Sequence, residues 1–275
     1  ISVIGRTRTA PEGDADHLRF AVVSCQNYQA GYFNAFRKIA ERADLDAVLH
    51  LGDYIYEYGS GEGTYGYSED RADRANLPAV ETVTLVDYRT RYSLYRLDAD
   101  LREAHRQHPF IAVWDDHEST NDSHESGAEN HQEDEGDWET RKAISKQAYY
   151  EWMPIRSFQP ERLFRTLKYG DLAELIMIDT RLEAREPQPL LASDTLEYRT
   201  MLGQEQLQWL GNRVSSSTAK WQTIGNQVIF SPFNVGFATE NPTILEEITL
   251  NESGLLDNWE ESTIHTLVIH QTIQI

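Results

Sequence analysis

Residues Asp46 to Tyr58 read Asp-Ala-Val-Leu-His-Leu-Gly-Asp-Tyr-Ile-Tyr-Glu-Tyr and contain the clearest signal for the fold of this chain. Residues 47–51 form a short, mainly apolar run that ends at Gly52 and is followed at once by Asp53. A buried parallel strand presents a reactive group at its carboxyl end in this way. Tyr56 follows three residues later, so a carboxylate and a phenol leave one strand end together and can reach one hard trivalent cation.

Two further strand-like runs end in residues that bind metals. Residues 18–24 lead to Cys25, the only cysteine in the chain, and residues 110–114 lead to the cluster Asp115-Asp116-His117-Glu118. Cys25 alone would indicate a small buried hydrophobe, and Tyr56 alone a packing residue. However, open α/β sheets place their sites at the carboxyl ends of strands, so we expect these side chains to converge.

The cluster after residue 114 predicts two different roles. A carboxylate and an imidazole that are adjacent on a turn point in different directions, so one can hold a metal while the other faces the substrate. Two cations that share one carboxylate are a common device for displacement at phosphorus. Asp53, reached from the middle strand, is the expected shared ligand.

Composition narrows the function classes. The 275 residues carry a net charge of -20, which argues against nucleic acid and against an anionic bilayer as partner, because no basic surface is available. With 40% hydrophobic residues and no apolar run of membrane-spanning length, we expect a globular protein with one main domain. An anionic substrate would need local positive charge from metal ions or arginines.

The remaining patterns predict alternating strands and helices. The expected helices cover residues 33–42, 85–97, 101–105, 138–152 and 204–214, and the further strands cover residues 163–169, 172–178, 221–224 and the last eleven residues, which include His270. Residues 59–82 and 119–137 are predicted to be a long surface loop and a solvated acidic loop. In the second loop, Asn121 lies nearest to a strand end and is a candidate oxygen ligand.

Five motifs follow one another along the chain: Val23-Ser24-Cys25-Gln26, Gly52-Asp53-Tyr54-Ile55-Tyr56, Trp114-Asp115-Asp116-His117-Glu118, Ile178-Asp179-Thr180-Arg181 and Ile224-Gly225-Asn226-Gln227. Their order resembles that in PhoD-type alkaline phosphatases, and the resemblance covers roughly residues 15–236. The resemblance places the chain among the wider calcineurin-like and purple-acid-phosphatase-like metallophosphoesterases. It implies a fold of class α/β, a four-layer α/β/β/α sandwich.

The resemblance also implies a site. A ferric ion would be held by Cys25, Asp53 and Tyr56, and calcium ions nearby would share Asp53 and reach Asp116; Zn²⁺ or Mn²⁺ is the alternative. His117 would stand beside the leaving group. The full set of expected metal ligands is Cys25, Asp53, Tyr56, Asp116, Asn121 and His270, the expected catalytic residues are Asp116, His117 and Arg181, and the expected substrate-binding residues are Arg181 and Asn226.

Both chain ends carry expectations as well. Residues 1–16 read as a linker or as the tail of an upstream β-sandwich domain, and residues 17–275 as the catalytic domain. The resemblance implies an exported, secreted or periplasmic, protein. Family members finish the site with Gly-Asp-x-His, for which the nearest match here is Leu267-Val268-Ile269-His270. We therefore expect that the catalytic domain is incomplete and that residues after about 237 depart from the natural chain.

The sequence thus predicts a metal-dependent hydrolase that cleaves small-molecule phosphate esters with a metal-activated water. The first alternative is a phosphodiesterase of phospholipase D type, because monoesterase and diesterase chemistry need nearly the same site. The second is a metal-binding protein of the same fold without turnover.

Overall fold

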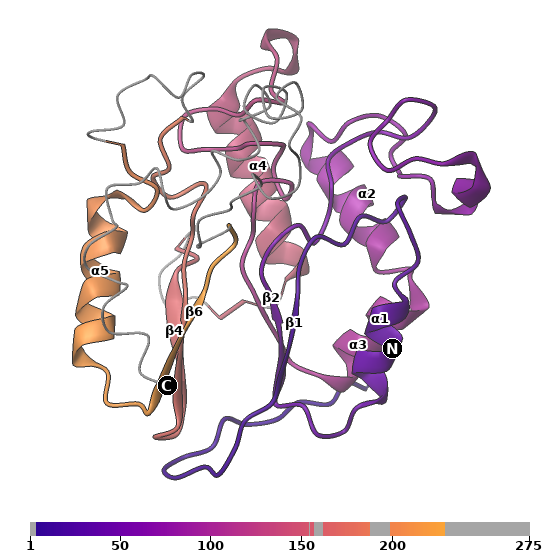
Figure 1. Ribbon diagram of the computed structural model, residues 1–275. Helices are drawn as coiled ribbons and strands as arrows, with labels where there is room; N and C mark the ends of the chain where they lie inside the picture. Colours follow the sequence, from indigo (N-terminus) through magenta and orange to yellow (C-terminus); the bar gives the residue numbers. More distant parts are fainter. Residues whose placement is uncertain (1–3, 154, 157–161, 188–198, 229–275) are drawn as a thin grey trace, which may run out of the picture.

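The computed structural model describes residues 4–153, 155–156, 162–187 and 199–228. Two three-stranded sheets lie face to face between helices (Figure 1). Helices α1 (Asn34–Glu41) and α3 (Ala99–Gln107) lie outside the first sheet, and α5 (Gly203–Ser216) lies outside the second. The order helix, sheet, sheet, helix is the predicted four-layer α/β/β/α sandwich.

The first sheet is parallel and carries the predicted site strands. Its order is β1 (Phe20–Val23), β2 (Ala47–His50) and β3 (Phe110–Ala112), so β2 lies in the middle, as predicted. Every residue of β2 is buried, as expected for a parallel strand with a mainly apolar sequence. Because the three strands are parallel, their carboxyl ends lie at one edge of the sheet.

The second sheet begins with the predicted hairpin. Strands β4 (Arg165–Tyr169) and β5 (Ala173–Met177) pair antiparallel around Gly170, which has a positive φ of 58°. Strand β6 (Trp221–Gly225) pairs parallel to β5, and α5 forms the connection between them. The carboxyl ends of β5 and β6 therefore point the same way.

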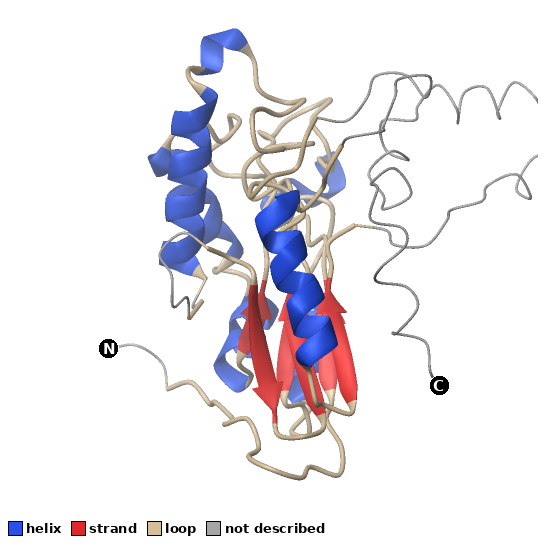
Figure 2. Cartoon of the chain, turned by 90° about the vertical axis from the view of Figure 1, so that its left-hand side faces the viewer, coloured by secondary structure: helices blue, strands red, loops and turns tan. Residues whose placement is uncertain are grey.

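The described residues contain two further α-helices. Helix α2 (Leu85–Tyr95) begins at a capping box made by Thr84 and Asp87, and α4 (Trp138–Trp152) begins where Asp137 accepts a hydrogen bond from Thr140 N. The predicted aromatic face of α2 is core, since Tyr88, Tyr92 and Tyr95 are fully buried. Side chains of both sheets join the same apolar cluster. Figure 2 shows the strands below a group of loops.

The structure bears out the first loop prediction and corrects part of the second. Residues 59–82 are mostly exposed or half-buried and contain only the 3₁₀ helix η1 (Glu69–Arg74), whose buried Arg74 pairs with Asp98 at 2.7 Å. In residues 119–137, which include the 3₁₀ helix η2 (Glu133–Glu135), Ser119, Thr120 and Ser123 are fully buried, so the start of this segment is not solvated. Buried polar side chains such as Arg74 and Thr120 donate hydrogen bonds to backbone carbonyl groups.

Several other predictions concern residues that the structure does not describe or does not test. His270, the predicted last strand and the residues after 237 lie outside it. Residues 4–19 have no helix or strand, and their assignment to a linker or an upstream domain stays a prediction. Within the described ranges, every helix is too short or too polar to cross a lipid bilayer.

Candidate active site

The ends of β1 and β2 are joined by backbone hydrogen bonds. Cys25 N donates to Gly52 O at 3.1 Å, and Gln26 N donates to Asp53 O at 3.0 Å. Cys25 and Asp53 both have left-handed backbone conformations, with φ of 57° and 55°. Non-glycine residues rarely adopt this conformation, and where they do the surrounding structure enforces it, commonly at functional sites.

Gly52 lets the end of β2 approach the segment after β3. Its φ is 103°, and a Cβ atom built there would lie 2.4 Å from the Cβ of Asp115. No side chain fits this gap, so the glycine before Asp53 brings two site segments into direct contact.

Glu118 holds the same two segments together. Its buried carboxylate accepts hydrogen bonds from the backbone N–H groups of Asp53 at 3.1 Å, Tyr54 at 2.6 Å and Asp115 at 2.8 Å. Burial raises the pKa of Glu118 to about 8, although these donors lower it. The sequence placed Glu118 in the ligand cluster, and the structure gives it a positioning role.

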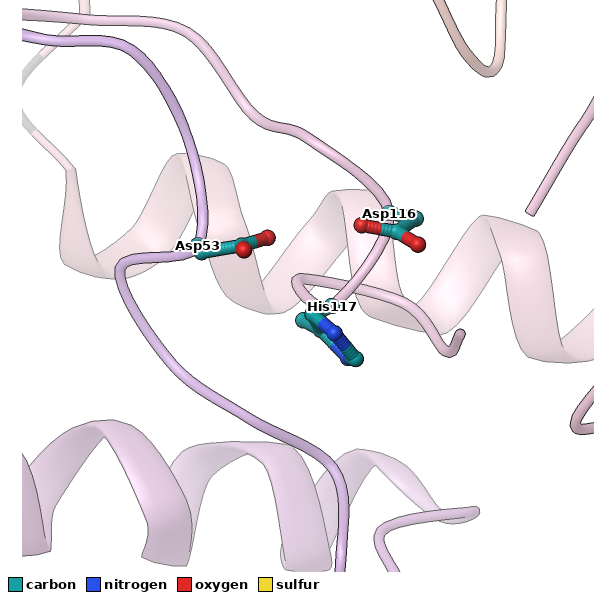
Figure 3. A group of neighbouring side chains, drawn as sticks. All are labelled: Asp53, Asp116 and His117. Carbon is teal, nitrogen blue, oxygen red and sulfur yellow. The ribbon is translucent and has the colours of Figure 1, made fainter. Parts of the chain in front are cut away.

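Asp53, Asp116 and His117 form the candidate metal group. Their potential ligand atoms all lie within 4.8 Å of one another, and all three side chains are buried (Figure 3). Asp53 Oδ1 has no hydrogen-bond partner among the described residues. A buried carboxylate oxygen without a partner is costly and is explained by a cation that binds it. The group therefore fits a metal ion.

The two carboxylates of this group differ in their surroundings. Burial raises the pKa of Asp53 well above its ordinary value, and the neighbouring carboxylates of Asp115 and Asp116 raise it further. Burial would also raise the pKa of Asp116, but the positive charges of Arg181 and His117 outweigh it and bring the pKa to about 2. A bound cation would ionise Asp53 by the same electrostatics.

His117 is oriented by a residue that sequence reasoning missed. Its Nδ1 lies 2.7 Å from Oε2 of Glu57, which is fully buried. Burial would lower the pKa of His117, but the carboxylates of Asp116 and Glu57 raise it well above its ordinary value. Glu57 lies within residues 46–58, and its position one residue after Tyr56 was the only sign in the sequence that it belongs to the site.

The predicted ferric ligands also lie together. Tyr56 donates its hydroxyl hydrogen to Asp53 Oδ2 at 3.0 Å. Cys25 reaches solvent and lies outside the apolar core, so the interpretation as a small core hydrophobe is wrong. Partial burial and the nearby Asp53 carboxyl raise the pKa of its thiol to about 12. Cys25 thus lies next to Asp53, outside the group that contains Asp116 and His117.

Arg181 reaches the site from the end of β5. Only 2% of its side chain is exposed, and its Nε donates to Asp115 Oδ1 at 2.6 Å, while one terminal nitrogen lies 3.7 Å from Asp116 Oδ1. Its backbone N–H donates to Asp179 Oδ1 at 2.9 Å. The guanidinium therefore neutralises part of the acidic cluster.

The other predicted site residues fall outside the metal group. The side-chain nitrogen of Asn121 donates to Glu129 at 3.0 Å, and its backbone N–H donates to Glu57 at 2.8 Å. The side-chain nitrogen of Asn226, just after β6, donates to Val228 O at 2.7 Å. The structure therefore turns the amide nitrogens of both residues toward protein partners, and their roles as ligand and substrate contact stay predictions.

An α/β/β/α sandwich with a buried carboxylate and imidazole group at its strand ends defines the class of metallophosphoesterase-like proteins. The PhoD-like phosphatase family matches residues 20–269, and the chain belongs to that family. Alkaline phosphatase D of Bacillus subtilis (strain 168) is 39% identical in an alignment of 250 residues that covers 86% of this chain. A solved structure of PhoD superposes with a TM-score of 0.74 at 38% identity over 84% of this chain. The resemblance derived from the five motifs is confirmed.

These relatives are longer than the chain. The matched region spans 42% of the Bacillus subtilis protein and 46% of the solved PhoD chain. The similarity therefore shows the family and the fold of this region.

Proposed function

We propose that this protein hydrolyses phosphate esters of small molecules in a metal-dependent reaction, as a phosphomonoesterase of alkaline phosphatase type. The observation that carries the proposal is the buried Asp53 Oδ1, which has no partner among the described residues and lies beside Asp116 and His117. The similarity to alkaline phosphatase D supports this chemistry and favours neither the phospholipase D type diesterase nor a protein without turnover.

We propose Fe³⁺ and Ca²⁺ as the cofactors, with Zn²⁺ or Mn²⁺ as the alternative. Cys25, Asp53 and Tyr56 would hold the ferric ion, and Asp53 and Asp116 would hold calcium. Thiolate, phenolate and carboxylate together suit a trivalent iron, whereas carboxylates alone suit calcium. Cations bound there polarise the phosphoryl oxygens and lower the pKa of water.

His117 supplies the proton in this proposal. Its Nδ1 is engaged by Glu57, so Nε2 is the ring atom left to face the substrate. The carboxylates of Asp116 and Glu57 raise the pKa of His117 and so favour the protonated imidazole, whose Nε2–H can donate to the leaving-group oxygen. Arg181 holds Asp115 and offsets the charge of Asp116, while direct contact of Arg181 or Asn226 with substrate stays a prediction.

The test is release of inorganic phosphate from an aryl phosphomonoester by the metal-loaded protein. We expect turnover that is lost in Asp53→Asn and kept in Asp44→Asn, which alters an exposed aspartate paired with Arg42. A metal-loaded wild-type protein that releases no phosphate would overturn the proposal. A diester rate above the monoester rate would favour the diesterase. An exported location stays a prediction from the resemblance alone.

A further inference from the structure

Three tyrosines form a row of aromatic rings from the site to the surface, which we call the aromatic row: Tyr56, Tyr58 and Tyr65. The Tyr56 ring stacks on the His117 ring with centroids 4.2 Å apart, and Tyr58 lies 5.5 Å from His117. Tyr65 stacks on Tyr56 at 5.9 Å and contacts Tyr58 at 5.2 Å. Exposure rises from 5% at Tyr56 to 58% at Tyr65, so the row connects the buried imidazole to solvent.

The backbone around Tyr65 is fixed although its ring is exposed. Gln29 is fully buried, and its Nε2 donates to Tyr65 O at 2.7 Å and to Gly59 O at 3.0 Å. Asn76 is also fully buried, and its Nδ2 donates to Tyr58 O at 2.9 Å. Two buried amides thus hold both outer members of the row.

This arrangement differs from ordinary packing. A tyrosine that only filled space would be buried, whereas more than half of the Tyr65 side chain meets solvent. A ring on a fixed backbone loses little conformational freedom when it contacts a ligand, and it offers a large apolar face. A buried amide thus holds the exposed ring of Tyr65 against Tyr56 and Tyr58, which contact the His117 imidazole, and this arrangement indicates a binding surface.

We propose that Tyr65, supported by Tyr58, contacts the organic part of the phosphoester and favours planar, apolar groups over small polar alkyl groups. The inference rests on the proposed function, which places the phosphoryl group at Asp53, Asp116 and His117. The leaving-group oxygen then lies against His117, where the aromatic row begins. An aromatic leaving group directed along the row stacks on Tyr65, and a glycerol-sized group does not reach it.

The experiment compares p-nitrophenyl phosphate with glycerol 2-phosphate in the metal-loaded protein. In Tyr65→Ala we expect kcat/KM for the aryl ester to fall about 3- to 10-fold relative to the alkyl ester, mainly through KM, as loss of one aromatic contact predicts. Tyr65→Phe keeps the ring and should restore the wild-type ratio. Tyr32→Ala is the matched control, since Tyr32 is 55% exposed and its hydroxyl contacts Asp73.

Binding of two non-hydrolysable analogues separates this inference from the proposed function. Wild-type protein should bind phenylphosphonate more tightly than methylphosphonate by calorimetry, and Tyr65→Ala should lose that preference. Equal weakening of both ligands, or no change in either, would overturn the inference. A wild-type protein that binds both phosphonates with the expected preference but releases no phosphate would refute the proposed function and leave the contact by Tyr65 standing.

Discussion

Glu57 and His117 form a buried pair across sixty residues of sequence, with Oε2 of Glu57 2.7 Å from Nδ1 of His117. The other carboxylate oxygen of Glu57 accepts from Asn121 N at 2.8 Å and from the Asn130 side chain at 3.0 Å. These donors and the His117 charge outweigh burial, which would raise the pKa, so the pKa of Glu57 is lowered. The pair therefore fixes both the position and the charge of the imidazole.

Glu57→Gln tests this positioning. The variant keeps the shape of the side chain but removes its charge, so we expect kcat to fall about 10- to 100-fold with a smaller change in KM. Steady-state kinetics on an aryl phosphate gives both parameters. Glu62→Gln, in an exposed loop position, is the control. An unchanged kcat in Glu57→Gln would show that His117 needs no such partner.

Tyr56→Phe tests the assignment of iron. The change removes the hydroxyl that lies 3.0 Å from Asp53 Oδ2 and leaves the stacked ring in place. We expect purified wild-type protein to contain iron and to absorb visible light through phenolate-to-iron charge transfer, and the variant to lose that band. Elemental analysis and an absorption spectrum measure both. Zinc or manganese without iron would replace the ferric assignment and leave the hydrolase proposal in place.

Gly52→Ala tests the close approach at the strand end. The added Cβ would lie 2.4 Å from the Asp115 Cβ, at a φ of 103°. Gly61→Ala is the matched control, because Gly61 has a φ of 121° but nothing within 4 Å of its Cβ position. Both variants place alanine at a positive φ, but only Gly52→Ala also creates a steric clash. We therefore expect Gly52→Ala to lower the free energy of unfolding by about 1 to 3 kcal/mol more than Gly61→Ala does. Equal denaturant midpoints for Gly52→Ala and Gly61→Ala would show that the segment after β2 can move away from Asp115 at little cost.

His50 should make the protein less stable in acid. It is fully buried in β2, where burial and the charge of Arg96 lower its pKa from 6.5 to about 3. Between these values the unfolded chain binds a proton that the folded chain does not, so this contribution to stability is lost as the pH falls below about 6.5. From pH 7 to pH 5 the loss amounts to about 2 kcal/mol.

His50→Leu should flatten that pH dependence. Denaturant unfolding at pH 7 and pH 5 gives the change in the free energy of unfolding for the wild-type protein and for the variant. The effects of all other titrating groups cancel when the two changes are subtracted. His17→Gln changes an exposed histidine and is the control. If the wild-type protein and His50→Leu lose equal stability between the two pH values, His50 is not the group that titrates.

Most of the secondary structure was predictable because its signals are local. The apolar run that ends at Gly52 and Asp53, and the aromatic spacing of Tyr88, Tyr92 and Tyr95, correspond closely to β2 and α2 in the structure. The convergence of Asp53, Asp116 and His117 followed from parallel strands ending at one edge. The surface loop at 59–82 was predicted from its polar composition, whereas the burial of Ser119, Thr120 and Ser123 in the second polar segment was not, because such burial leaves no hydrophobic periodicity.

The amino-acid sequence alone shows which reactive side chains follow the strands, because strand periodicity and turn residues are properties of short segments. The contacts that those side chains make become visible in the folded chain. It pairs Glu57 with His117, turns Glu118 toward three backbone N–H groups and holds Tyr65 beside the site through Gln29. These contacts join residues far apart in sequence, and a buried hydrogen bond between distant segments leaves no periodic pattern in either one.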